Sequence, residues 1–430
     1  MKSIVEQAPG MITFSFERED ADVSHIEKQR FSMNSEDVYF VVPEELGDVH
    51  PDLIGLATIL LCNPFVSERL ALPLPTSRLF FETVSSVISR YEIIEKIDED
   101  LAPIELNVNG NPGLCFSGGA DSAAALSIMP GRTIPIFLNR PMRRSVSHYD
   151  SSAPLAICEL LENSGFNVQV IESNLEYIRS PTGFPTDLAN AIPAILLSQH
   201  LGLDSIAFGT VLESGFGIGH EKFIDYGKGS HFRFYSTIFS AVGIGLNLPI
   251  LGISEVGTGR MGLSSPVASI SQSCIRGKWK KPCKNCWKCF RKILLSNAIS
   301  GEIQSQDFER MLKRPEVQIR LSSFPISHEN VIAYSIQRID ISEVEALIPL
   351  AAKLDLQQDL AFLERWYPDS IEFVPDKYRN FIRERIMEHM DPGSYEDMQR
   401  IREWDMGPHL SSSRAIRAND RLINHWQSLQ

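Results

Sequence analysis

The residues with the clearest capacity for chemistry lie in one short loop. The loop reads Ser117, Gly118, Gly119, Ala120, Asp121 and Ser122. Apolar residues on both sides predict a short buried strand before it and a helix that starts at about Asp121. The first N–H groups of a helix have no internal partner and carry about half a positive charge, so glycines here let an anion approach closely. The serine hydroxyls add donors, and we expect the loop to bind phosphate.

The loop lacks the lysine that ends a phosphate loop of the kinase type. Without a lysine on the terminal phosphates, we expect the loop to hold a leaving pyrophosphate while another group attacks the α-phosphorus. The competing interpretation is a glycine turn before an ordinary helix.

Four cysteines form the second group of chemically capable residues. They are Cys274, Cys283, Cys286 and Cys289, separated by eight, two and two residues. Four thiolates at this spacing can close a tetrahedron around Zn²⁺, and such a site is structural because no coordination position remains for water or substrate. The alternative is a set of unrelated free cysteines. The density of the four thiols favours a zinc site.

The cysteine segment is strongly basic. Between Arg276 and Lys292 there are eight basic residues and no acidic residue. A zinc ion held by four thiolates has a net charge of about −2, so part of this basicity offsets the site. The remainder could attract ATP, an acidic partner or RNA.

The overall composition is that of a globular protein with room for two or three domains: 430 residues, of which 43% are hydrophobic. The chain has no run of about 18 apolar residues, which a membrane-spanning helix requires. Its N-terminal segment is charged throughout and contains no signal-peptide core. We therefore expect a cytoplasmic protein with no membrane partner.

The charge is unevenly distributed along the chain. Residues 1–110 have a net charge of −12, residues 111–300 of +5 and residues 301–430 of −6. A basic centre between acidic flanks is typical of an ATP-handling domain with appended interaction modules. The acidic flanks argue against nucleic-acid partners, since those need Lys and Arg to neutralise phosphates. We divide the chain at these boundaries into an α/β N-terminal extension, an ATP-binding domain with the zinc site, and a mostly helical C-terminal region.

Strands and helices alternate through the central segment, which predicts a parallel sheet with helices on both faces. Its strands are expected at 113–116, 134–138, 168–171, 205–208 and 249–253. Its helices are expected near 121–129, 151–164, 187–201 and 231–245. Outside it, strands are expected at 11–17, 38–42 and 104–108, and helices from Pro51 and over 76–89, 341–350 and 378–390. In an open parallel sheet, ligands bind beyond the carboxyl ends of the strands.

Two segments after the expected strands contain further candidates. Arg140, Arg143 and Arg144 follow the second strand, and either contact ATP phosphates or form a solvated loop. Residues 215–219 follow the fourth strand and are interpreted as a flexible substrate loop. Glu213, Glu221 and Asp225 lie in the same stretch, and either one of them accepts hydrogen bonds from a purine-like ring or they are exposed loop carboxylates.

The sequence Ser-Gly-Gly-x-Asp-Ser after a strand resembles the signature of the PP-loop ATP pyrophosphatases, which adenylate a substrate and release pyrophosphate. Together with the cysteine cluster, preceded by Ser271-Gln272-Ser273, it resembles the QueC family, the 7-cyano-7-deazaguanine synthases. The resemblance covers roughly residues 111–295. It implies a Rossmann-like, HUP-type parallel sheet and ATP-dependent activation of 7-carboxy-7-deazaguanine as an acyl-adenylate. The implied ATP-binding residues are Ser117, Gly118, Gly119, Asp121 and Ser122, with Cys274, Cys283, Cys286 and Cys289 as zinc ligands.

Two departures from the QueC family alter the expected reaction. The Pro-Asp-Cys-Arg part of a family motif is missing where this chain has Gly217-Ile218-Gly219-His220, and the chain is nearly twice the usual length. The chain resembles the long, divergent QueC-like proteins of bacterial antiviral operons, in which a deazaguanine is attached to a protein amine. We expect an AMP-forming ligase of this kind, with a protein partner or acceptor. The alternatives are a plain nitrile-forming synthase, a tRNA thiolase, and a non-catalytic nucleotide-binding scaffold.

The expected mechanism places Mg²⁺-ATP on the loop, with the β- and γ-phosphates at the start of the helix. A bound carboxylate attacks the α-phosphorus, and the acyl-adenylate then reacts with an amine. Ser117 and Asp121 are the expected catalytic residues, and Asp121 is expected to help to hold Mg²⁺. Catalysis is by positioning and charge stabilisation.

Overall fold

The structure is a computed structural model that describes residues 1–29, 31–302 and 305–428. The N-terminal part contains a three-stranded antiparallel sheet in the order β1-β2-β4. Its strands are β1 (Lys2–Ala8), β2 (Met11–Glu17) and β4 (Asp37–Val41). Strand β2 alternates as its sequence predicts, with Ile12, Phe14 and Phe16 buried. Helix α2 (Pro51–Cys62) is buried along nearly its whole length and packs against helix α6 (Ile192–Leu196), which lies beside the central sheet.

Short elements complete the N-terminal part. They are α1 (Asp20–Ile26), β3 (Ser32–Met33), β5 (Arg69–Leu70), α3 (Arg78–Val87) and β6 (Glu92–Ile93). The strand expected at 104–108 is absent, and that expectation was wrong. Leu106 and Val108 are exposed there, so the apolar alternation covers no core and has no strand to pair with.

The central sheet is parallel and has five strands in the order β12-β11-β7-β8-β9. The strands are β7 (Asn111–Cys115), β8 (Ile134–Asn139), β9 (Gln169–Glu172), β11 (Leu203–Ala207) and β12 (Gly245–Asn247). A further short strand, β10 (Arg179–Ser180), pairs with β3 outside this sheet. The chain order reverses between β7 and β11, which is the switch point where open α/β sheets bind ligands. The predicted mixed α/β architecture with a parallel sheet is confirmed.

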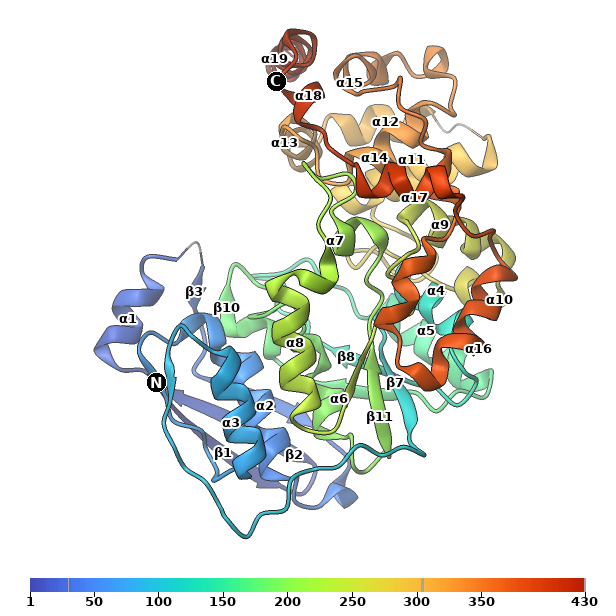
Figure 1. Ribbon diagram of the computed structural model, residues 1–430. Helices are drawn as coiled ribbons and strands as arrows, with labels where there is room; N and C mark the ends of the chain where they lie inside the picture. Colours follow the sequence, from blue (N-terminus) through green and yellow to red (C-terminus); the bar gives the residue numbers. More distant parts are fainter. Residues whose placement is uncertain (30, 303–304, 429–430) are drawn as a thin grey trace.

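Helices cover both faces of this sheet (Figure 1). They are α4 (Ala120–Ile128), α5 (Ser152–Asn163), α6 (Ile192–Leu196) and α8 (Ser230–Ser240), and α7 (Leu212–Phe216) follows β11. Along β7, Leu114 and Phe116 belong to the hydrophobic core that includes α4 and α5, whereas Cys115 belongs to the core that includes α6 and α8. This alternation, together with burial on both faces, accounts for the apolar sequence of the strand.

The fifth strand lies earlier in the chain than expected. It was predicted at 249–253, but the structure has it at Gly245–Asn247, and residues 249–253 form buried turns before helix α9 (Glu255–Ser264). The turns close through hydrogen bonds from Leu251 N–H to Leu248 O and from Ile253 N–H to Ile250 O. A short apolar run that is buried on all sides does not reveal by periodicity whether it is a strand.

The C-terminal part is helical, as predicted. Its larger helices are α9 (Glu255–Ser264), α10 (Pro266–Ser269), α11 (Trp287–Ser300), α12 (Ser305–Leu312), α13 (Pro315–Ser322), α14 (Glu329–Ile336), α15 (Ile348–Lys353), α16 (Asp376–Met387), α17 (Tyr395–Arg402), α18 (Gly407–Leu410) and α19 (Ser413–Ser428). Most of them lie above the sheet in Figure 1, but α16 returns to pack against α4. There the Tyr378 hydroxyl donates to Asp204 Oδ2 at 2.7 Å, which joins α16 to β11.

Short 3-10 helices occur throughout the described chain. They are η1 (Glu44–Leu46), η2 (Asn63–Phe65), η3 (Leu175–Ile178), η4 (Ala189–Ala191), η5 (Tyr226–Lys228), η6 (Ile341–Glu343), η7 (Glu345–Leu347), η8 (Ala361–Glu364) and η9 (Pro368–Phe373).

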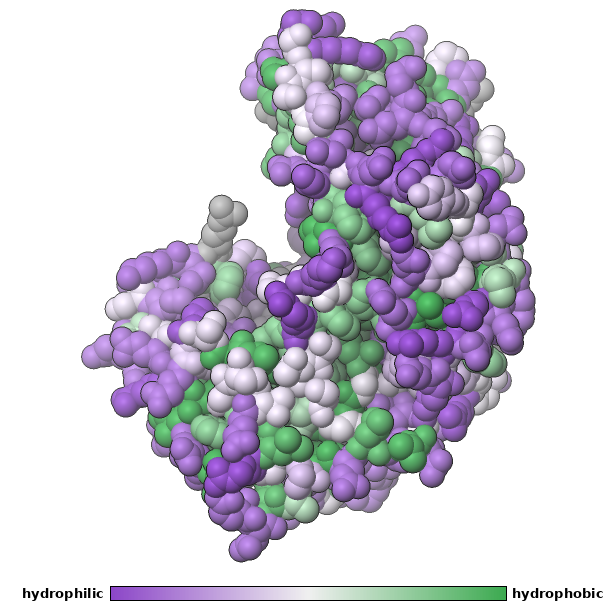
Figure 2. All heavy atoms as spheres, viewed as in Figure 1, coloured by the Kyte–Doolittle hydropathy of each residue, from purple (hydrophilic) through white to green (hydrophobic). Residues whose placement is uncertain are grey.

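Figure 2 shows that hydrophilic side chains cover most of the upper part of the molecule in this view. The surface is hollowed between this part and the N-terminal elements at the lower left. Among the described residues, no helix combines the length and the apolar character that crossing a membrane requires.

Candidate functional site

The predicted phosphate loop lies at the carboxyl end of β7 and leads directly into α4. The Ser117 N–H donates to Ser122 Oγ at 3.2 Å, and the two serine hydroxyls lie 3.1 Å apart. The Ser122 hydroxyl also donates to Gly119 O at 3.1 Å, so it ties the loop to the first turn of the helix. Ser122 is buried and Ser117 is exposed. Ser122 therefore shapes the loop, and Ser117 is the hydroxyl that a ligand can reach.

Two glycines are required by the geometry of this site. Gly118 has φ of +72°, in the left-handed region that favours glycine. Gly209 follows β11, and a Cβ placed on it would lie 2.9 Å from the backbone N of Ser122. Only glycine lets the chain after β11 approach the start of α4 so closely. The switch point of the sheet is thus closed around the loop.

The segment that precedes the cysteines is bonded to the loop. The Gln272 N–H donates to Gly118 O at 2.8 Å, and the Ala120 N–H donates to Ser273 Oγ at 3.2 Å. The phosphate loop and the cysteine segment, about 150 residues apart in sequence, therefore form one site. One of the first N–H groups of α4, expected to be free, is already bound to a hydroxyl.

Asp121 points toward two polar side chains from later helices. Thr258 Oγ1 donates to Asp121 Oδ1 at 2.9 Å, and Lys292 Nζ lies 3.4 Å from the same oxygen. Lys292 also lies 3.1 Å from Glu255 Oε2. Burial alone lowers the pKa of Lys292, but the two carboxylates outweigh it and raise the pKa above its ordinary value. Lys292 is therefore a permanent cation beside the loop.

Behind Lys292 lies a buried network of charged and polar groups. Glu255 Oε1 lies 2.7 Å from the Arg291 guanidinium, with which it forms an ion pair, and 3.0 Å from His328 Nδ1. The Glu255 N–H donates to Glu213 Oε2 at 3.0 Å, and Asn330 Nδ2 donates to Glu213 Oε1 at 3.0 Å. The network links α9, α11, α7 and α14, so it joins the loop region to the C-terminal helices.

The two glutamates of this network respond to burial in opposite directions. Burial, followed by the negative charge of Glu255, raises the pKa of Glu213 to about 7. Burial also acts to raise the pKa of Glu255, but its three basic neighbours outweigh it and hold that pKa below its ordinary range. Glu255 is thus the charged member of the pair.

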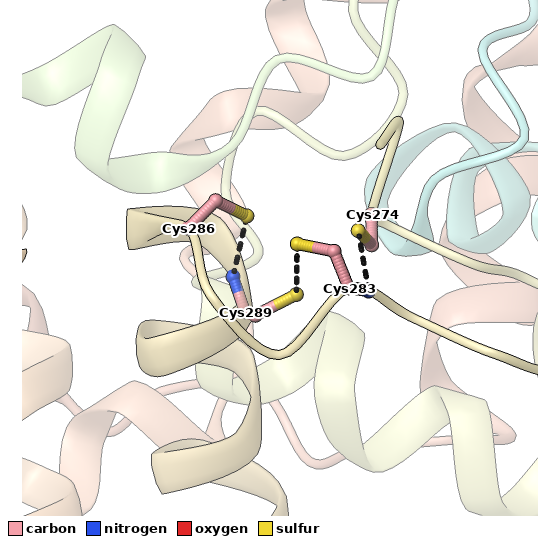
Figure 3. A group of neighbouring side chains, drawn as sticks. All are labelled: Cys274, Cys283, Cys286 and Cys289. Carbon is pink, nitrogen blue, oxygen red and sulfur yellow. Dashed lines mark hydrogen bonds between the residues drawn. The ribbon is translucent and has the colours of Figure 1, made fainter. Parts of the chain in front are cut away.

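The four predicted cysteines converge, as Figure 3 shows. Their sulfur atoms all lie within 4.8 Å of one another, and the Cys283 and Cys289 sulfurs are 3.7 Å apart. A tetrahedral zinc ion with Zn–S bonds of about 2.3 Å requires sulfurs roughly 3.8 Å apart, so the cluster could hold a metal ion such as zinc. Backbone N–H groups at 3.3 to 3.4 Å from Cys274 Sγ and Cys286 Sγ further stabilise thiolate charge.

A cavity of about 370 Å³ lies between the loop and the cysteine cluster. On the loop side it is lined by Ala120, Thr258 and Ser273, and on the cluster side by Cys274 and Cys289. Helix α11 supplies Lys288 and Lys292 and several apolar side chains. The cavity thus has a cationic wall and an apolar wall.

The three arginines after β8 do not gather at the loop as free cations. Arg140 is buried, pairs with Glu176 and lies with its guanidinium 4.4 Å from the centre of the Tyr149 ring. Arg144 pairs with Asp150 at 3.1 Å. Arg143 is exposed and stacks on Tyr177, 4.5 Å from the ring centre. Arg140 is neither a phosphate ligand nor solvated here, because it is committed to internal contacts.

Residues 215–219 do not form a flexible loop, and that prediction was wrong. They include the end of α7 and a tight turn, and all five are buried, as is Glu213. A Cβ placed on Gly219 would lie 1.8 Å from Asn330 Oδ1, so this turn is packed against α14. Glu213 is therefore not exposed, and its two oxygens are bonded inside the protein. The sequence did not reveal this because the partners come from distant helices.

Sequence reasoning missed several residues at the site. Thr258, Ser273 and Lys292 all contact the loop, but they follow it by more than 130 residues. Lys288 and Lys292 lie one helical turn apart in the basic segment, and this spacing on a helix was the one available signal. Ser273 belongs to the Ser271-Gln272-Ser273 segment that precedes the cysteines, but its sequence assigned it no contact with the loop. Thr258 belongs to no motif, so only the fold places it.

A comparison with family models matches residues 235–405 to a family of unknown function, DUF6395. The match covers less than half of the chain. It includes α9, the cysteine cluster and α14, and it begins after the phosphate loop. Comparisons with curated proteins and with solved structures give no match.

Proposed function

We propose that this protein is an ATP-dependent, AMP-forming ligase of the PP-loop ATP pyrophosphatase type. The observation that carries the proposal is the position of the Ser-Gly-Gly-Ala-Asp-Ser loop. It lies at the switch point of a five-stranded parallel sheet, and hydrogen bonds join it to the segment that leads into the cysteine cluster. The start of α4 provides the partial positive charge that phosphate groups require.

The proposed reaction has two steps. A carboxylate oxygen of the substrate attacks the α-phosphorus of ATP, a P–O bond forms, and the bond to pyrophosphate breaks. An amine nitrogen then attacks the acyl carbon, the bond to AMP breaks, and the amine loses a proton to solvent. An amide is formed, and AMP and pyrophosphate are released.

The loop residues contribute binding and orientation in this scheme. Ser117 and the backbone of Gly118 and Gly119 hold phosphate oxygens, and Ser122 keeps the loop in shape. Asp121 is partly open to solvent, and one carboxylate together with substrate phosphates is a common way to hold Mg²⁺. Mg²⁺ would neutralise charge on the phosphates. The cysteine cluster would hold Zn²⁺ as a structural ion, since four thiolates leave no open position.

The substrate class rests on the resemblance to the QueC family. We propose a deazaguanine-type carboxylate, similar to 7-carboxy-7-deazaguanine, as the group that is activated. We propose that the amine belongs to a partner protein in a bacterial antiviral system. With ammonia as the amine, the same two steps would give a primary amide, and the nitrile-forming synthase reaction would need a second molecule of ATP to activate the amide oxygen, which leaves with the AMP.

The remaining cysteines disfavour a tRNA thiolase. Such an enzyme needs accessible catalytic thiols, and the three cysteines outside the cluster are Cys62, Cys115 and Cys158, all buried. Burial raises the pKa of each thiol, to about 12 for Cys158. A buried thiol of raised pKa is a poor nucleophile.

The test is the release of AMP and pyrophosphate from Mg²⁺-ATP, with and without 7-carboxy-7-deazaguanine. Asp121→Ala should lower this release by at least about 100-fold, because it removes the carboxylate that orients the metal and the phosphates. Zinc content and the far-ultraviolet circular dichroism spectrum should be unchanged.

Glu159→Ala is the matched control, since Glu159 is an exposed carboxylate on α5 and does not line the cavity beside the loop. Release from the wild type that does not depend on the deazaguanine would refute the substrate assignment. Full activity of Asp121→Ala would refute the assigned role of the loop.

A further inference from the structure

Two lysines of α11 face the cavity between the loop and the cysteine cluster, but only one of them has a protein partner. Lys292 lies within 3.4 Å of Asp121 and Glu255. Among the residues that the structure describes, Lys288 makes no ion pair or hydrogen bond, and it is exposed where it lines the cavity. An unpaired ammonium on the wall of a cavity is available to an anion.

The other wall of this cavity includes Ala120, the first residue of α4. The start of that helix attracts negative charge as well. The cavity therefore brings together a helix N-terminus, the paired cation Lys292 and the unpaired cation Lys288. A group with several negative oxygens, such as a phosphate, suits this combination better than a single carboxylate does.

The cysteine cluster determines where Lys288 lies. Helix α11 begins at Trp287, directly after its N-cap residue Cys286, and Cys289 is in its first turn. Lys288 stands between these two metal-ligand candidates, so its backbone position follows from theirs. The cluster is thereby connected to the nucleotide site, although a four-thiolate metal takes no part in chemistry.

We propose that Lys288 binds a phosphate group of the nucleotide and takes the place of the lysine that the loop lacks. The inference rests on the proposed function, because it assumes that ATP binds at the loop. The anion could instead be the carboxylate of the substrate, which offers the same charged oxygens. The experiment is designed to distinguish the two sources.

The test measures the binding of three probes to the zinc-loaded full chain by titration calorimetry: inorganic pyrophosphate, Mg²⁺-ATP and 7-carboxy-7-deazaguanine. Lys288→Ala should weaken the binding of pyrophosphate and of Mg²⁺-ATP by roughly 10- to 100-fold, which is the usual effect of losing one charge-assisted hydrogen bond. Lys288→Arg should restore part of the affinity. Binding of the carboxylate should stay unchanged.

Lys281→Ala is the matched control, because Lys281 is an exposed lysine of the same basic segment and does not line the cavity. Wild-type binding of ATP with no loss in Lys288→Ala would overturn this inference and leave the proposed function standing. If Lys288→Ala weakens only the binding of 7-carboxy-7-deazaguanine, the inference would likewise be overturned and the proposed function would stand. A wild type that binds neither ATP nor pyrophosphate would overturn both the inference and the proposed function.

Discussion

Glu213 is a buried carboxyl group whose charge depends on pH near neutrality. Its folded pKa of about 7 lies above the ordinary value of 4.5, because the group is buried and lies beside the charged Glu255. Between these two pH values the folded chain holds a proton that the unfolded chain has released. The stability that Glu213 contributes is therefore complete below about pH 4.5 and is lost as pH rises through 7.

Glu213→Gln should remove this dependence on pH. Between pH 5 and pH 8, the free energy of unfolding of the wild type should fall relative to that of Glu213→Gln, by on the order of 2 kcal/mol. Urea unfolding at pH 5, 6, 7 and 8 measures the difference. Glu159→Gln changes an exposed carboxylate, so its free energy of unfolding should depend on pH in the same way as that of the wild type. If the free energy of unfolding of Glu213→Gln also depends on pH as that of the wild type does, the raised pKa of Glu213 is wrong.

Gly209 provides a second test at the scale of single residues. Gly209→Ala would place a methyl group 2.9 Å from the Ser122 backbone nitrogen. The neighbouring atoms of Asp121 and Ser122 belong to the backbone, so relieving the contact would require the backbone itself to shift. We expect a loss of stability of about 1–3 kcal/mol and weaker binding of Mg²⁺-ATP. Thermal unfolding and calorimetry measure both quantities.

Gly131→Ala is the control for this substitution, since nothing lies within 4 Å of a Cβ at Gly131. Equal stability and equal ATP affinity of the Gly209 and Gly131 variants would contradict the close approach of the β11 loop to α4.

At the scale of elements, α11 connects the two motifs. Its first turn carries cysteines of the cluster, and its second carries Arg291 and Lys292, which contact Glu255 and, through Lys292, Asp121. Sequence periodicity identified β2, α2, β7 and β8 close to their observed bounds, because each has a clear buried face or sequence boundary. It misplaced the last strand of the sheet, where the chain is buried on all sides.

Removal of the metal should loosen α11 and the loop together. For the chain purified with zinc, we expect about one zinc ion per chain, and chelation should lower the melting temperature by on the order of 5 °C. The affinity for Mg²⁺-ATP should fall as well, and added zinc should restore both properties. Metal analysis, thermal unfolding and calorimetry provide the readouts. Cys286→Ser with normal zinc content and stability would count against a structural metal site.

At the scale of the whole molecule, the C-terminal helices are part of the site. His328 and Asn330, at the start of α14, contact the two buried glutamates, and α16 packs on α4. The family match over residues 235–405 covers these helices and the cysteines together. The net charge of −12 in residues 1–110 makes the N-terminal part acidic.

The sequence by itself determined the local features of this protein: the loop of serines and glycines, the spacing of the four cysteines, and the alternation of strands and helices. Each depends on residues close together in the chain, whose spacing and periodicity can be read directly. The tertiary structure alone decided which distant groups meet them. Thr258, Ser273 and Lys292 reach the loop because the parallel sheet brings β7 beside β11 and α11 packs against α9, and such long-range contacts leave no periodic pattern in the sequence.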